Sequence, residues 1–190
     1  MIQVSLKGEA RKFESGVTVA QVAQSIGAGL YRAACAGRLD DQVVDLRTPL
    51  TKDCTLEILT FDDPEGKRAY WHTTSHIMAQ AVKHLFPTAG FAIGPAIENG
   101  FYYDFDLPRT LTPEDLSAIE AEMKKIIKAD LPLERFELEP DKALELMEQE
   151  HQVYKIELIK EHSGKGEKIS FYRQGDYVDL CAGPHLMSTC

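Results

Sequence analysis

The sequence predicts an α+β protein of two domains joined by a short linker, and three observations lead to this fold class. Residues 2–6 alternate between apolar and polar side chains, as a half-buried strand does. Residues 67–86 carry apolar side chains close to the helical period instead. Residues 61–66 (FDDPEG) are polar and contain a proline and a glycine, which is typical of a linker. We therefore expect a small domain at residues 1–61 and a larger one at residues 62–190.

The first domain is predicted to be a sheet packed on one helix. A turn at residues 7–9 separates the first strand from a second strand that ends at Phe13. Thr18 can cap a helix over VAQVAQSI, and Gly27 can end it. Further strands are expected at residues 33–36, 43–46 and 55–60. This order within about 60 residues is typical of a ubiquitin-like β-grasp fold.

The second domain is predicted to mix helices with short strands. Its first helix, residues 67–86, ends before Pro87. Strands at 91–97 and 101–107 flank Asn99-Gly100, a strong tight-hairpin signal. Thr112 and Pro113 begin a helix that runs to about residue 128. A strand at 133–138, a helix at 140–150, a loop at 163–166 and strands at 169–172 and 177–180 complete the domain. Residues 153–160 fit a helix or a strand equally well.

Composition and charge exclude several classes of protein. Hydrophobic residues make up 44% of the chain and charged residues 27%, which excludes a largely disordered or collagen-like chain. No apolar run approaches the roughly 20 residues that span a bilayer, and the N-terminus does not read as a secretory signal. We therefore expect a cytoplasmic protein without a membrane partner, whose four cysteines are free thiols.

The formal net charge of −9 argues against a whole-surface grip on nucleic acid. An RNA contact would need a local basic patch or another domain. The best candidate is a late group of basic residues, namely Lys155, Lys160, Lys165, Lys168 and Arg173. On the predicted helix at 113–128, Lys124, Lys125 and Lys128 fit a solvated charged face better than an RNA site.

Two pairs of residues could carry chemistry. His72 and His76 are spaced i, i+4, so a helix places both imidazoles on one face. Cys181 and His185 follow a predicted strand, and Gly183-Pro184 between them can turn the chain back. Each pair alone fits an ordinary buried or surface position as well. A zincin protease is disfavoured, because that motif needs a glutamate where Thr73 stands.

Together, the two pairs make a set of one cysteine and three histidines, which suits tetrahedral zinc. If all four residues bind, the site is closed and structural. If one is withdrawn, or if no metal is held, an open position can take a water or a substrate hydroxyl. The spacing leaves these cases open.

Neighbouring polar residues could complete such a site. By strand alternation Asp179 faces the same side as Cys181, where it could bind an amino group or orient a histidine. Lys155, flanked by apolar residues, could stabilise an oxyanion or bind a phosphate, or it could be an exposed lysine on an amphipathic strand. Tyr102 and Tyr103 could offer a hydroxyl or a stacking face, or they could be cross-strand packing.

The motifs HTTSH, IGPAIENGFYYDFD and VDLCAGPH, after a β-grasp-like module, resemble the N-terminal region of the bacterial-type threonyl-tRNA synthetase family. Residues 1–61 resemble its TGS domain. Residues from about 62 resemble its editing domain, which shares its fold with the second additional domain of alanyl-tRNA synthetase and with free-standing aminoacyl-tRNA deacylases. The resemblance implies an editing pocket lined by His72, His76, Gly94, Tyr103, Lys155, Asp179, Cys181 and His185.

The resemblance also implies an activity, which is removal of serine wrongly attached to threonine tRNA. In that reading His72 and Lys155 are catalytic, and Asp179 holds the substrate amino group. In the related deacylases, the residues that match His72, His76, Cys181 and His185 hold zinc. The resemblance therefore implies zinc as a possible cofactor. The partners would be the 3′ end of seryl-tRNA(Thr) and the remaining domains of a homodimeric full-length enzyme.

The chain stops at Cys190, without a class II synthetase core or ATP-binding motifs, so we expect a fragment that cannot attach threonine. The alternative is a zinc-stabilised RNA-binding or regulatory module without catalysis.

Overall fold

The computed structural model describes residues 1–162 and 166–190, and the chain separates into two compact units. The first unit comprises Met1–Thr73 and Gly183–Met187, and the second comprises Thr74–Ala182 and Ser188–Cys190. The predicted domain division between residues 61 and 62 stays a prediction.

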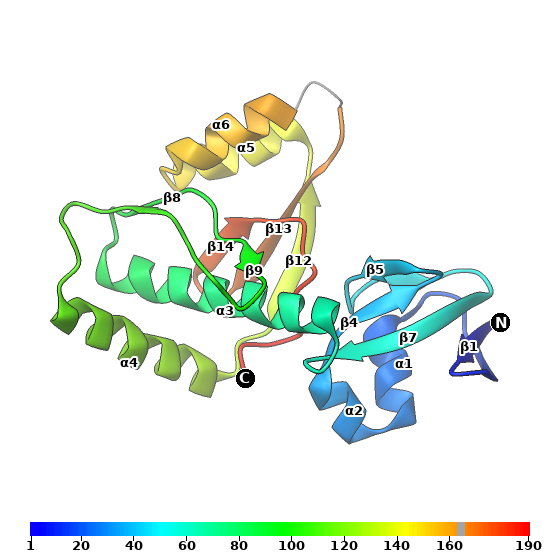
Figure 1. Cartoon of the computed structure of the whole chain (residues 1–190). Coiled ribbons are helices and arrows are strands. Elements are labelled where there is room, and N and C mark those ends of the chain that lie inside the picture. The colour runs from blue at the N-terminus through cyan, green and yellow to red at the C-terminus, as the bar shows by residue number, and fades with distance from the viewer. Residues whose placement is uncertain (163–165) are drawn as a thin grey trace. The chain divides into compact units, whose positions relative to one another are not determined.

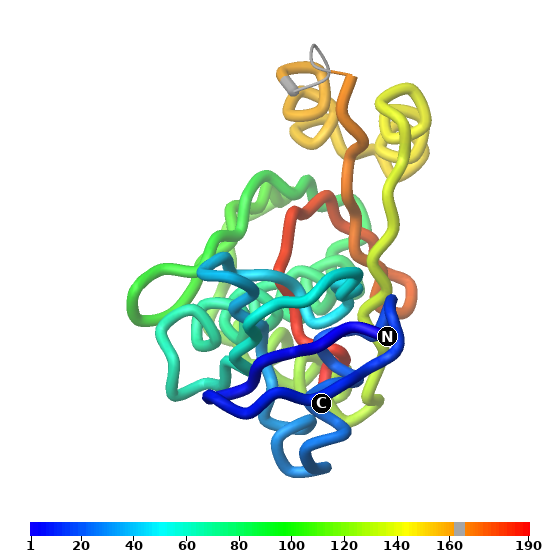
Figure 2. Tube along the Cα trace, turned by 90° about the vertical axis from the view of Figure 1, so that its right-hand side faces the viewer, coloured from blue at the N-terminus to red at the C-terminus, as the bar shows by residue number. Residues whose placement is uncertain are grey.

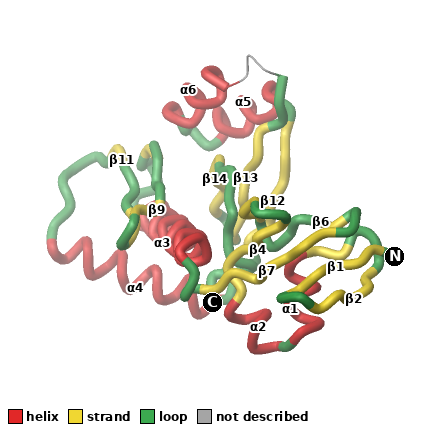
Figure 3. Tube along the Cα trace, turned by 45° about the vertical axis from the view of Figure 1, so that its right-hand side comes forward, coloured by secondary structure: helices red, strands yellow, loops and turns green. Residues whose placement is uncertain are grey.

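The first unit is built on a five-stranded sheet in the order β2-β1-β7-β4-β5, with β1 parallel to β7 (Figure 3). A two-stranded ladder of β3 and β6 lies outside this sheet. The elements are β1 (Ile2–Leu6), β2 (Glu9–Phe13), β3 (Val17–Thr18), α1 (Val19–Ile26), α2 (Ala28–Ala33), β4 (Ala34–Leu39), β5 (Gln42–Val44), β6 (Pro49–Leu50) and β7 (Cys54–Thr60).

The helix α1 supplies one wall of the core of this unit. Thr18 accepts a hydrogen bond from the backbone N–H of Gln21, and the side chain of Gln21 accepts one from the backbone N–H of Thr18, so the predicted cap at Thr18 is confirmed. The apolar face of α1 includes Val19 and Val22, which pack with Val4 and other sheet residues. The order of strands and helix therefore agrees with the predicted β-grasp arrangement.

The second unit contains a three-stranded antiparallel sheet, β12-β13-β14, together with two short ladders, β8 with β11 and β9 with β10. The helix α3 is divided between the two units, because its residues up to Thr73 belong to the first unit and those from Thr74 belong to the second. Figures 1 and 2 show α5 and α6 side by side at one end of β12 and β13. The elements are α3 (Pro64–Leu85), β8 (Gly90–Phe91), β9 (Ala96–Ile97), β10 (Gly100–Phe101), β11 (Phe105–Asp106), α4 (Pro113–Ala129), β12 (Leu133–Leu138), α5 (Pro140–Gln149), α6 (Val153–His162), β13 (Ile169–Gln174) and β14 (Tyr177–Leu180).

Most predicted elements of this unit are present, but the lengths of two predicted strands are wrong. Thr112 caps α4 as predicted. The ambiguous residues 153–160 lie in the helix α6. The predicted strands 91–97 and 101–107 are wrong in length, because each is interrupted: β8 pairs with β11, and β9 pairs with β10. Between these ladders Asp104 still donates a backbone hydrogen bond to Ile93 and accepts one from Ala92. The turn itself is formed by residues 98–99, so it begins one residue before the predicted Asn99-Gly100. Of the predicted loop at 163–166, residues 163–165 lie outside the described residues.

Two smaller findings bear on the sequence-based expectations. None of the four cysteines forms a disulfide in the structure. No helix in the described part of the chain has both the length and the apolar character needed to cross a membrane.

Candidate functional site

The helix α3 carries both histidines of the first pair, one turn apart. The ring of His76 is 3% exposed and lies edge-on to Tyr177, with ring centroids 6.2 Å apart. The ring of His72 is partly exposed and stacks on His185, with centroids 4.2 Å apart. The helical spacing thus puts two imidazoles on one side of α3, as predicted.

Asp179, on β14, lies at the centre of a buried polar cluster in the second unit. Its side chain is 4% exposed, and its Oδ1 lies 3.0 Å from Lys155 Nζ. Its Oδ2 accepts hydrogen bonds from the hydroxyls of Tyr103 (2.7 Å) and Tyr177 (3.0 Å) and lies 3.5 Å from His76 Nε2. Both carboxylate oxygens are therefore occupied. An ammonium group that came to bind Asp179 would have to displace one of these partners.

The environment of Asp179 shifts the pKa values of the cluster. Burial by itself raises the pKa of Asp179, but the nearby charge of Lys155 and the partners His76 and Tyr103 outweigh burial and leave the pKa below its usual value. Burial and the neighbouring Asp179 carboxylate raise the pKa of Tyr103 and of Tyr177 well above the usual value for tyrosine. Asp179 is thus held as a carboxylate, and the two tyrosines are held as hydrogen-bond donors.

Lys155 reaches Asp179 from α6. Its side chain is 5% exposed, and its Nζ also lies 5.4 Å from the centroid of the Tyr103 ring, an arrangement in which the ring face attracts the cation. The burial of Lys155 corrects one expectation, because a buried lysine in an ion pair cannot contact an RNA backbone. Of the other basic residues in that group, Lys165 lies outside the described residues.

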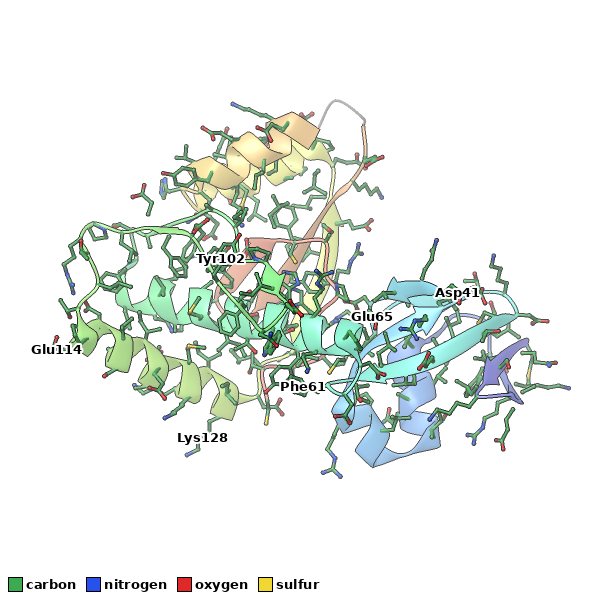
Figure 4. All side chains as sticks on the ribbon, viewed as in Figure 1. Asp41, Phe61, Glu65, Tyr102, Glu114 and Lys128 are labelled. Atoms are coloured by element: carbon green, nitrogen blue, oxygen red, sulfur yellow. The ribbon has the colours of Figure 1, made fainter. Side chains whose placement is uncertain are left out.

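Gly94 and Tyr103 fit together closely. A Cβ added at Gly94 would overlap Cδ2 of the Tyr103 ring. The carbonyl of Gly94 also accepts a hydrogen bond from the hydroxyl of Ser75 on α3 (3.0 Å). Only glycine therefore lets the Tyr103 ring occupy its position against this backbone. Tyr102, in contrast, is 43% exposed and is labelled in Figure 4.

His185 belongs to the first unit and is fully buried. Its Nδ1 lies 2.9 Å from the hydroxyl oxygen of Thr73, which also accepts a hydrogen bond from the backbone N–H of Leu186 (3.0 Å). Its backbone N–H donates to Oδ2 of Asp45 (3.1 Å). The position of His185 is therefore set in two ways: Thr73 contacts its ring, and Asp45 binds its backbone N–H.

The structure brings the two predicted pairs together. His72, His76, Cys181 and His185 each offer one ligand atom, and these atoms all lie within 4.8 Å of one another. In tetrahedral zinc sites, with bonds of about 2.0–2.3 Å, the ligand atoms lie roughly 3.3–3.8 Å apart. Three imidazoles and one thiol match the ligand preference of zinc, and small side-chain shifts would close the set. These four residues thus form a group that could hold a metal ion.

Some residues of this region were not found from the sequence. Tyr177 could have been, because it lies two residues before Asp179 on the same strand and so faces the same side. Thr73 stands between the two histidine positions, but its spacing does not indicate that it contacts His185. Asp45 and Arg47 lie so far from His185 along the chain that no local pattern joins them.

The charged face predicted for α4 is present. Lys124 pairs with Glu120 and Lys125 with Glu122 along the helix, and Figure 4 shows Glu114 and Lys128 projecting from its two ends. A separate groove of about 310 Å³ lies in the first unit. It is lined by residues of β1, β2, α1, α2 and β7, and it contains none of the predicted site residues.

Comparison with known proteins identifies relatives of the chain. Residues 2–60 match the TGS domain family. All 190 residues align with the threonine–tRNA ligase of Acetivibrio thermocellus at 58% identity, covering 30% of that protein. The corresponding ligase of Caldanaerobacter subterraneus subsp. tengcongensis is 56% identical over 182 residues, and that of Clostridium botulinum (strain Loch Maree) is 54% identical over 190. These alignments cover 28% and 30% of the two proteins, so the chain spans less than a third of the length of these curated relatives.

Proposed function

Because the chain is homologous over its whole length to the N-terminal region of bacterial threonine–tRNA ligases, we propose that it is a proofreading hydrolase module of such an enzyme. Its reaction is hydrolysis of the ester that joins serine to the 3′ end of threonine tRNA, in the cytoplasm. The observation that carries this proposal is the gathering of His72, His76, Cys181 and His185 within 4.8 Å of one another in a chain of that ancestry. The remaining synthetase domains and a second subunit are its proposed protein partners.

The hydrolysis is needed because a binding pocket for threonine discriminates poorly against serine. Serine is threonine without one methyl group, so a pocket built for threonine also admits serine. One methyl group supplies only about 1–3 kcal/mol of discrimination. A second site that admits serine and clashes with the extra methyl group of threonine reverses the selection, so that only the wrong ester is hydrolysed.

The residues around Asp179 can serve this hydrolysis in distinct ways. Water attacks the carbonyl carbon, the bond to the ribose oxygen breaks, and that oxygen takes up a proton. Lys155 can polarise the carbonyl or assist the proton transfer, and the partly exposed His72 can accept a proton from the water. Asp179 holds the amino group of serine in exchange for one of its present partners. Gly94 and Tyr103 shape the wall beside it.

His76, Cys181 and His185, with His72, are the residues that would hold zinc. When bound, zinc supplies Lewis-acid polarisation of a carbonyl oxygen. The donor set fits that ion. Metal analysis of the purified protein, and of a Cys181→Ser variant, measures whether zinc is bound at these residues.

A deacylation assay with labelled seryl-tRNA(Thr) and threonyl-tRNA(Thr) tests the proposal. The chain should release serine faster than buffer alone and leave the threonyl ester intact. His72→Ala and Lys155→Ala should each lower the rate at least tenfold, a loss within the range that a general acid or base contributes. Lys124→Ala, which removes an exposed lysine of α4, is the matched control and should leave the rate unchanged.

Several outcomes would contradict the assignment. Equal rates on the two esters, or no rate above background at high protein concentration, would remove it. A closed set of four ligands also suits a zinc-stabilised RNA-binding module without catalysis. Bound zinc with tRNA binding and no deacylation would favour that alternative. Circular dichroism of the variants separates loss of catalysis from loss of fold.

A further inference from the structure

The segment that carries His185 is held by two residues from a distant part of the chain. Asp45 and Arg47 lie between β5 and β6, 140 and 138 residues before the backbone groups that they bind. Both side chains are mostly buried, at 10% and 16% exposed. These contacts lie within the first unit, which contains Gly183–Met187.

The contacts form a closed network. Arg47 Nη1 donates to Asp45 Oδ1 (2.9 Å) and to the carbonyl of His185 (3.2 Å), and Arg47 Nη2 donates to the carbonyl of Leu186 (2.7 Å). The second carboxylate oxygen of Asp45 accepts the backbone N–H of His185 (3.1 Å). The guanidinium fork and the carboxylate thus bind both the N–H and the C=O of His185 with charge-assisted hydrogen bonds.

The loop that carries Asp45 and Arg47 is itself fixed by packing and by backbone hydrogen bonds. Leu46, between them, is 1% exposed and belongs to the main core of the unit. Its carbonyl accepts the backbone N–H of Ala20, and the carbonyl of Thr48 accepts that of Val19, so the loop is tied to the start of α1. On the other side, Leu186 packs beside Leu59 and Ala69. The backbone of the His185 segment is therefore fixed to the β-grasp-like part of the chain.

We propose that Asp45 and Arg47 are positioning residues that hold the His185 ring in place for the ester-hydrolysing site. They touch no reacting atom. They fix the backbone from which the ring projects, while Thr73 and His72 contact the ring itself. This inference rests on the proposed function and adds to it two residues of the first unit on which the position of His185 depends.

Amide hydrogen exchange measured by NMR on the whole chain tests the network directly. Arg47→Ala and Asp45→Asn should each raise the exchange rate of the His185 N–H at least tenfold and shift the ring signals of His185 and His72. Exchange at Val4 and Leu59, in the sheet, should stay unchanged. Arg38→Ala is the matched control, because Arg38 pairs with Glu57 and Glu65 in the same unit. Asp45→Asn keeps the shape of the side chain, so it serves if Arg47→Ala does not fold.

Kinetics test what the positioning is for. In the deacylation assay both variants should lower kcat at least tenfold with KM for seryl-tRNA within twofold of its original value, whereas Arg38→Ala should change neither. Unchanged exchange at His185 in both variants would overturn the inference, as would an equal loss of kcat in Arg38→Ala. If the unmodified chain has no deacylase activity, the proposed function fails, and the exchange and ring signals alone decide whether Asp45 and Arg47 hold His185.

Discussion

At the scale of single residues, Asp179 organises the buried polar cluster, and its charge is balanced chiefly by Lys155. Both groups are nearly removed from water, at 4% and 5% exposed. A buried pair of this kind contributes little net stability compared with apolar residues, but removing one partner strands the other charge. Single and double substitutions should therefore have very different effects.

Asp179→Asn keeps the size of the side chain and removes its charge. The Lys155 ammonium is then left buried without a counter-charge, so the free energy of unfolding should fall by about 3–5 kcal/mol. Asp179→Asn combined with Lys155→Met should recover much of this loss, since neither charge remains buried. Urea unfolding followed by circular dichroism measures both changes.

The control for this comparison is Glu120→Gln, which breaks the exposed pair with Lys124 on α4. Its effect on the free energy of unfolding should stay within about 0.5 kcal/mol. An Asp179→Asn variant as stable as Glu120→Gln would show that the buried pair is not formed in solution.

Gly94 is the second residue whose identity is dictated by a contact. Gly94→Ala places a methyl group against Tyr103, so the ring must move and its hydrogen bond to Asp179 is strained or lost. We expect the free energy of unfolding to fall by about 1–3 kcal/mol. Gly29→Ala in α2 is the matched control, because no atom lies within 4 Å of the added Cβ. That variant should be unchanged or more stable by up to about 1 kcal/mol. Equal stabilities in urea would contradict the close fit.

At the scale of elements, α3 is tied to its neighbours by polar side chains at its C-terminal end. His84 there lies 2.9 Å from Glu122 on α4 and 2.9 Å from Asp176 in the turn before β14. Partial burial lowers the pKa of His84, but its hydrogen bonds to the two carboxylates outweigh burial and raise the pKa above the ordinary value. The junction of these elements should therefore depend on pH.

The sign of that dependence follows from the raised pKa. His84 binds its proton more tightly in the folded state, so its stabilisation is complete below the unfolded pKa of about 6.5 and is lost as the pH rises through the folded value. His84→Gln should lower the free energy of unfolding by up to about 1 kcal/mol near pH 5.5 and by less near pH 8.5. His151→Gln, at an exposed histidine, is the control. Equal losses at both pH values would show that His84 is not protonated in this contact.

At the scale of the whole molecule, the acidic charge limits how the chain can hold RNA. The net charge is −9, and several lysines are already paired with carboxylates. A protein with 6–10 phosphate contacts loses about 10³–10⁵ in affinity between roughly 50 and 200 mM salt. For this chain we expect a loss of less than about tenfold in tRNA affinity over that range, measured by fluorescence anisotropy.

We expect the basic residues near the end of the chain to make most of the contacts with tRNA phosphates. Lys168→Ala, which removes a side chain that is 60% exposed, should lower the slope of log affinity against log salt by about 1. Lys125→Ala on α4 should leave the slope unchanged. A steep slope that neither substitution alters would point to RNA contacts elsewhere on the surface.

Taken by itself, the sequence determined the elements and the types of residue available for chemistry. The cap at Thr18 and the helix after Thr112 depend on neighbours a few positions away, so local patterns predict them. The hairpin turn near Asn99-Gly100 is predicted to within one residue, since residues 98–99 form it and Gly100 begins β10. The i, i+4 histidines follow from helical geometry in the same way. Local patterns could not separate helix from strand at residues 153–160, where apolar and polar residues suit both.

Only the tertiary structure decided which of these residues meet. Tyr103 reaches Asp179 across 76 positions and Asp45 reaches His185 across 140, and both contacts depend on how distant elements pack. Packing also turned Lys155 inward to Asp179, where sequence alone allowed an exposed lysine. The physical reason is that periodicity sets which face of an element a side chain occupies, whereas its partner is set by whatever element covers that face.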